Sequence, residues 1–133
     1  MVIRPRLEAA PATHSASVMG ITLGATHDTG GTVFVYREPI ERVSHWREEE
    51  MARVLAYTIA HEVGHVLLPY PGHTSSGLMR EVWARDDLFQ ISRGSMRFTP
   101  AQASAMRAKV SQCFLANASR SLPPARDDAL PVP

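Results

Sequence analysis

Residues 61–73 read His-Glu-Val-Gly-His-Val-Leu-Leu-Pro-Tyr-Pro-Gly-His, and this stretch decides both the predicted fold and the predicted chemistry. It overlaps the segment 46–68, in which apolar side chains recur at spacings of three and four residues: Met51, Val54, Leu55, Ile59, Val63, Val66 and Leu67. Three acidic residues, Glu48–Glu50, stand near the start of this pattern and suit the positive end of a helix dipole. We therefore predict one long helix that ends at the proline-rich turn of residues 69–72.

Two histidines four residues apart lie on the same face of a helix, so His61 and His65 can both reach one metal ion. Glu62 lies beside them and can hold a water molecule next to that ion without occupying a coordination position, as a general base requires. A catalytic zinc ion usually takes three protein ligands and keeps a fourth position for water. We expect His73, which the turn carries back toward the helix end, to be the third ligand. The alternative is a carboxylate from the segment that follows, with the candidates Glu81, Asp86 and Asp87.

Shorter elements flank the long helix. Residues 18–23 and 32–36 have the composition of strands and are separated by the turn-rich residues 28–31, so they predict a hairpin. Residues 78–91 have short-helix character. Residues 99–102, Thr-Pro-Ala-Gln, combine an N-cap hydroxyl, a proline at the first helical position and a reciprocal capping glutamine. The predicted class is α+β: a small twisted sheet, antiparallel or mixed, packed on the long helix, with two further helices after it.

The length of 133 residues fits one domain, which we place at residues 17–118. Residues 1–16 are expected to form a flexible N-terminal arm and residues 119–133 a flexible, proline-rich tail. The formal net charge is +1, and no basic block is interleaved with aromatic residues, so we expect no nucleic-acid partner. The apolar runs are too short to span a membrane. The single Cys113 excludes an internal disulfide and a cysteine-based zinc site, so the six histidines stand out as candidate metal ligands.

The first residues do not read as an export signal. Arg4 and Arg6 give a basic start, but Glu8, Pro11 and His14 interrupt any apolar stretch. We therefore expect a cytoplasmic location by default, and secretion if the natural chain begins further upstream. We also expect a monomer whose partner is a peptide or protein substrate.

Residues 61–79 resemble the zinc-binding region of the metzincin metalloproteases, and most closely the matrixin-like branch, whose pattern is His-Glu-x-x-His-x-x-Gly-x-x-His followed by a methionine-containing turn. The resemblance implies a minimal metzincin-like, or zincin, catalytic domain with His61, His65 and His73 as zinc ligands and Glu62 as the general base. Met79 takes the place of the turn methionine.

Two features depart from the metzincin pattern. Leu68 stands where the family has its chain-reversing glycine, and His73 comes two residues late, so Gly72 would have to supply the bend. The chain also resembles a group of small bacterial proteins that share the stretch matching His73–Arg80, a tryptophan soon after it, here Trp83, and the helix start at Phe98–Gln102. By analogy with metzincins, strand 32–36 would border the substrate cleft.

These patterns predict a zinc metalloendopeptidase that hydrolyses peptide bonds by means of a zinc-bound water activated by Glu62. Two alternatives stay open. One is a zinc-binding or interaction module without turnover, because only about 45 residues precede the zinc helix, whereas metzincins usually have several strands and a helix there. The other is a regulatory cytosolic metallopeptidase whose third ligand is a carboxylate.

Overall fold

The computed structural model describes residues 2–4, 17–24, 31–45, 47–69 and 72–120. Three strands, β1 (Val2–Arg4), β2 (Gly20–Leu23) and β3 (Thr32–Tyr36), form one sheet in the order β1-β3-β2. β2 pairs with β3 antiparallel and places Ile21 opposite Phe34, whereas β1 pairs with β3 parallel. The sheet is therefore mixed, and the antiparallel pairing of the hairpin strands is confirmed.

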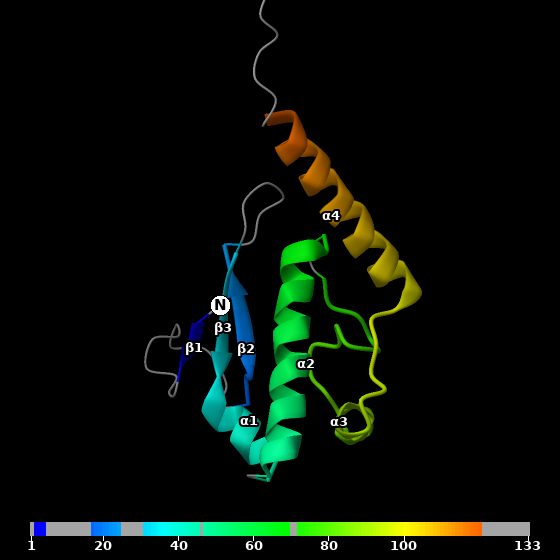
Figure 1. Ribbon diagram of the computed structural model, residues 1–133. Helices are drawn as coiled ribbons and strands as arrows, with labels where there is room; N and C mark the ends of the chain where they lie inside the picture. The colour runs from blue at the N-terminus through cyan, green and yellow to red at the C-terminus, as the bar shows by residue number, and fades with distance from the viewer. Residues whose placement is uncertain (1, 5–16, 25–30, 46, 70–71, 121–133) are drawn as a thin grey trace, which may run out of the picture.

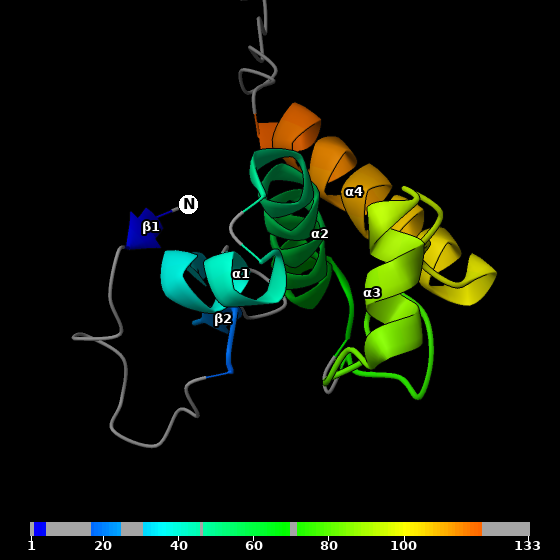
Figure 2. The ribbon, with the colours of Figure 1, turned by 90° about the horizontal axis from the view of Figure 1, so that it is seen from below.

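Four helices follow the sheet: α1 (Arg37–Val43), α2 (Glu48–Leu67), α3 (Arg85–Ser92) and α4 (Pro100–Arg120). α2 lies between the sheet on one side and α3 on the other, and this arrangement holds in both views (Figures 1 and 2). α4 passes the C-terminal end of α2 and continues beyond it (Figure 1). The α+β class and the long central helix are confirmed. Among the described residues, no helix is long and apolar enough to cross a membrane.

The core lies where the sheet and α3 meet the two faces of α2. Its buried apolar members come from β3, α1, α2, α3 and the loops around α3: Val33, Val35, Ile40, Val54, Leu78, Ile91 and Met96. Val33 and Val35 alternate with the half-buried Phe34 along β3, as expected for the central strand of a small sheet. α2 is thus held by apolar burial on both sides, which fixes the position of the side chains on its remaining face.

Two elements correct the sequence-based predictions. The flexible arm predicted for residues 1–16 is wrong for Val2–Arg4, which pair with β3, while residues 5–16 lie outside the described residues. α1, which was not predicted, begins directly after β3. Its first turn contains Pro39, which suits a position without an intrahelical donor, and an Arg37–Glu41 ion pair spans one turn. The buried Ile40 holds α1 to the core.

The two helices predicted after α2 are present, with changed boundaries. The helical pattern over residues 78–91 forms a helix only at Arg85–Ser92. The reciprocal cap at the start of α4 is present, since the Thr99 N–H donates to Gln102 Oε1 (2.9 Å) and the Gln102 N–H donates to Thr99 Oγ1 (3.3 Å). α4 runs to Arg120, so residues 119 and 120 of the predicted tail are helical, and residues 121–133 lie outside the described residues.

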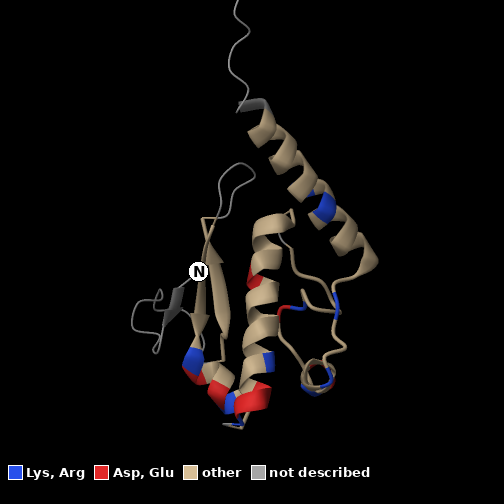
Figure 3. Cartoon of the chain, viewed as in Figure 1, with Lys and Arg blue, Asp and Glu red and all other residues tan. Residues whose placement is uncertain are grey.

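Charged residues of both signs are mixed where α1 meets the start of α2 (Figure 3). Glu48–Glu50 occupy the first turn of α2, as the helix-dipole argument requires, and Arg47 pairs with Glu50 at 3.1 Å. The C-terminal half of α2 contains a single acidic residue, Glu62. That isolated carboxylate lies beside the histidines.

Candidate metal centre

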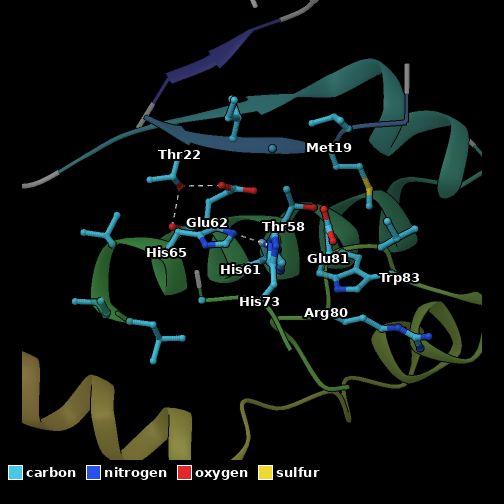
Figure 4. Close-up of a pocket in the computed structure, with 18 of the residues that line it drawn as sticks. Met19, Thr22, Thr58, His61, Glu62, His65, His73, Arg80, Glu81 and Trp83 are labelled. Atoms are coloured by element: carbon cyan, nitrogen blue, oxygen red, sulfur yellow. Dashed lines mark hydrogen bonds between the residues drawn. The ribbon is translucent and has the colours of Figure 1, made fainter. Parts of the chain in front are cut away.

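Three histidine side chains converge at the C-terminal half of α2. His61 and His65 lie one helical turn apart, and His73 approaches them from the segment after the helix (Figure 4). One ring nitrogen from each of the three lies within 4.8 Å of the others, and the Nε2 atoms of His61 and His65 are 3.1 Å apart. Two imidazoles on a tetrahedral zinc ion have nitrogens about 3.3 Å apart, given a Zn–N bond of about 2.05 Å. The donor set and its spacing fit zinc.

The ring of His61 is fixed by a hydrogen bond outside the cluster. Its Nδ1–H donates to the carbonyl oxygen of Leu78 at 2.8 Å, and the indole N–H of Trp83 donates to the same oxygen at 3.3 Å. The Trp83 ring contacts the His61 ring edge to face, with centroids 5.8 Å apart. Because Nδ1 carries the proton, His61 Nε2 presents a lone pair toward the other two histidines, which is the arrangement typical of a metal-binding histidine.

The chain reversal that brings back His73 occurs at Gly72. Its φ of +75° belongs to the left-handed region, and a Cβ atom there would lie 3.0 Å from His65 Nδ1. Leu68, by contrast, is extended (φ −97°, ψ 151°) and ends α2 without any bend that requires glycine. The left-handed conformation that the metzincin-like pattern would place at Leu68 is therefore found at Gly72.

Met79 packs against α2 at Gly64, the residue before His65. It is completely buried, and a Cβ atom placed on Gly64 would lie 2.3 Å from its Sδ. The Thr74 N–H donates to the Met79 carbonyl oxygen at 2.9 Å, which closes the loop that carries His73. Gly64 is thus required by the close approach of the methionine, and Met79 supports the site without contributing a ligand atom.

Glu62 is buried against the edge strand β2. Glu62 is only 4% exposed. The Thr22 hydroxyl lies 2.8 Å from Glu62 Oε2 and 2.9 Å from the Glu62 main-chain oxygen (Figure 4). Because a hydroxyl has one proton, Thr22 donates to one of these two oxygens at a time. Gly20 leaves room for the Glu62 side chain, because a Cβ atom at residue 20 would lie 2.7 Å from Glu62 Cγ and Oε1. Burial raises the pKa of Glu62 from 4.5 to about 7, and the Thr22 hydrogen bond opposes this rise.

The two helical histidines are held in the neutral form. Burial lowers the pKa of His65 from 6.5 to about 4, and the neighbouring His61 and His73 lower it further. Burial also lowers the pKa of His61, against the opposing effect of its hydrogen bond to Leu78. Neutral imidazole is the form that binds a metal, so near pH 7 no proton has to leave either ring before a metal can bind.

The raised pKa of Glu62 predicts a pH-dependent stability difference. Because the folded state holds the Glu62 proton more tightly than the unfolded state, stability is lost as pH rises from 4.5 through 7. Glu62→Gln cannot ionise, so in metal-free protein its stability advantage over the parent should grow by about 2 to 3 kcal/mol between pH 5 and pH 8. Urea unfolding of both proteins at the two pH values measures this growth. An unchanged difference would mean that Glu62 titrates normally.

The alternative carboxylate ligands lie elsewhere. Asp87 is buried, but its Oδ2 accepts from Arg80 Nη1 at 2.9 Å and from the Ala84 N–H at 2.8 Å, so it caps α3. Asp86 is exposed in the first turn of α3, and Glu81 is exposed beside the cleft. Within the described part of the chain, the cluster able to hold a metal consists of the three histidines alone.

A cleft of about 1300 Å³ opens over the histidines and Glu62. β2 and the residues before it line one wall, and α4 contributes Ala105, Ala108, Lys109 and Gln112. The prediction that strand 32–36 borders the cleft is wrong, because β3 pairs on both edges and the outer strand is β2. Thr22 was not predicted, since 40 residues separate it from Glu62.

Comparison with protein-family models places this chain in a known class. The model for zincin-like metallopeptidases matches residues 13–81, slightly more than half of the chain, and the match includes all three histidines and Glu62. The protein therefore belongs to the zincin-like metallopeptidase family. Neither a search of curated proteins nor a search of solved structures finds a match.

Proposed function

We propose that this protein is a zinc-dependent endopeptidase in which His61, His65 and His73 hold the zinc ion and Glu62 is the general base. The observation that carries the proposal is the convergence of three imidazole nitrogens beside a buried carboxylate inside an open cleft. Zinc bound there would polarise the substrate carbonyl and make a water molecule more acidic. The resemblance to the matrixin-like branch, with Met79 as its turn methionine, belongs to the same proposal.

Glu62 carries out the proton transfers in this mechanism. Its carboxylate takes the proton of the attacking water and later gives it to the leaving amine, and a pKa near 7 suits a group that must do both. Thr22 keeps the carboxylate at the edge of β2, while Gly20 gives it room. The protein's own contribution is therefore a proton acceptor held in place before the substrate arrives.

β2 supports the proposal that the substrate is an extended peptide. Within the described residues it is the outer strand of the sheet on the cleft side, and residues 17–22 and 24 all line the cleft. A strand edge can pair with an extended chain through main-chain hydrogen bonds. Binding along such a length favours cleavage inside a chain over removal of a terminal residue.

Metal removal tests the function directly. We expect EDTA to abolish cleavage of a mixed peptide library and one equivalent of zinc to restore it, with peptide products identified by mass spectrometry. Cleavage that persists after complete zinc removal would contradict the proposal. Stoichiometric zinc binding without any cleavage would instead favour a zinc-binding module that has no turnover.

A further inference from the structure

The buried hydroxyl of Thr58 has no partner. Thr58 lies on α2 three residues before His61 and is only 2% exposed. Within the described part of the chain, its Oγ1 is the one buried side-chain nitrogen or oxygen that makes no hydrogen bond. Threonine within a helix commonly donates to a carbonyl of the preceding turn, which does not occur here. A buried polar group without a partner is destabilising, so its presence next to a cleft points to a ligand.

Thr58 lines the same cleft as three other side chains at the His61 end: Met19, Glu81 and Trp83 (Figure 4). Met19 and Trp83 are half-buried and provide apolar surface, and hydrogen bonds from the Tyr36 N–H to the Met19 carbonyl and from the Trp83 indole to Leu78 hold both residues in place. Glu81 is exposed and brings a carboxylate. We name these four residues the Thr58 recess.

The charge balance at this end of the cleft is acidic. Glu62 and Glu81 both line it. The one nearby cation, among the described residues that line this end, is Arg80, and its guanidinium is paired with Asp87 at 2.9 Å. Lys109 lines the cleft from α4, which borders the opposite end of the cleft near the C-terminus of α2 (Figures 1 and 4). Apart from the zinc ion that the proposed function requires, a positive group entering the recess would therefore meet the Glu81 carboxylate and no unpaired guanidinium among the described residues that line this end.

We propose that the Thr58 recess binds a basic substrate side chain, lysine or arginine, next to the scissile bond. This inference rests on the proposed peptidase function. The aliphatic stem would pack on Met19 and Trp83, and the charged end would donate hydrogen bonds to Thr58 Oγ1 and the Glu81 carboxylate. The Trp83 ring adds a favourable cation–π contact.

Other substrate side chains pair less completely with the polar groups of the Thr58 recess. An aliphatic side chain leaves the Thr58 hydroxyl unpaired, and an acidic one is repelled by Glu81 and Glu62. Tyrosine can pair with the hydroxyl but does not neutralise Glu81. A preference for lysine over norleucine, which has a similar stem and no charge, isolates the contribution of the charged end.

Matched fluorogenic peptides that differ at one position next to the cleaved bond test the proposal. For the zinc-loaded parent we expect kcat/KM for the lysine peptide to exceed that for the norleucine peptide by about 10- to 100-fold. Thr58→Val and Glu81→Gln should each reduce that ratio toward one, and Thr58→Ser should preserve it. The controls Thr32→Val and Glu48→Gln, both at exposed positions, should keep the parental ratio.

Two further readouts separate this inference from the proposed function. Binding of the same peptides to zinc-loaded Glu62→Gln protein, measured by fluorescence anisotropy, tests the recess even if no peptide is cleaved, and there too lysine should bind more tightly than norleucine. The thermal midpoint of Thr58→Val should equal or exceed that of the parent, because the hydroxyl has no structural partner. Equal binding of lysine and norleucine, tighter binding of tyrosine, or a lowered midpoint would overturn the inference.

Discussion

Replacing Glu62 by glutamine is expected to lower kcat/KM for peptide hydrolysis by about 10²- to 10⁴-fold, the range typical of a lost general base. Glutamine has nearly the same shape and still accepts a hydrogen bond from Thr22, so the contact with β2 should survive. What it cannot do is take a proton from water. The loss should appear in kcat, since the side chain acts on the attacking water and is not required for substrate binding.

Zinc content and a graded variant make this prediction specific. Zinc stoichiometry should be unchanged in Glu62→Gln, because the three histidine nitrogens supply the metal-binding atoms. Thr22→Val keeps the carboxylate but removes the hydroxyl that holds it, so we expect a smaller fall in kcat, of about tenfold, with Thr22→Ser close to the parent. Cleavage by Glu62→Gln at the parental rate would exclude Glu62 as the base.

The parts of the site that could be predicted from the sequence are those set by local periodicity. The spacing of His61 and His65 places both on one face whenever the segment is helical, and the apolar repeat made the helix unambiguous. The start of α4 was equally local, because Thr99 and Gln102 cap each other within four residues. Such features need no knowledge of the rest of the chain.

The parts that could not be predicted depend on contacts between distant segments. β1 is a strand because it pairs with β3. Its three residues are too few to show a strand periodicity in the sequence. Which strand lines the cleft is decided by the order β1-β3-β2, which the sequence does not specify. The hydrogen bond from Thr22 to Glu62 follows from that order, and so does the contact of Gly20 with the same carboxylate.

His73 lies close to the other two histidines although the segment before it differs from the metzincin pattern that residues 61–79 resemble. A bend at the position of Leu68 would need a left-handed residue there, whereas Leu68 is extended and the left-handed residue is Gly72, four positions later. Gly72 then supplies the left-handed conformation and lies against His65. With the left-handed residue at position 72, the centroid of the His73 ring lies 4.6 Å from that of His65 and 5.4 Å from that of His61.

His73→Asn should therefore lower zinc affinity by more than about 100-fold, which exceeds the 10- to 100-fold cost of losing a residue that merely supports a ligand. An asparagine side chain is shorter and offers no imidazole nitrogen, so only His61 and His65 would remain. Competition with a chromogenic chelator measures the affinity. The matched control is His45→Asn, at an exposed histidine outside the cluster with φ +49°, a conformation that asparagine tolerates.

The same titration decides between the two sets of ligands that the sequence allows. If a carboxylate completed the site, Glu81→Gln or Asp86→Asn would weaken zinc binding and His73→Asn would not. The geometry predicts the reverse, because Glu81 and Asp86 lie outside the cluster of nitrogens.

Asp87→Asn is expected to lower the free energy of unfolding without changing zinc affinity, since Asp87 holds Arg80 and the first turn of α3. Parental zinc affinity in His73→Asn would exclude His73 as a ligand and would require a different third donor.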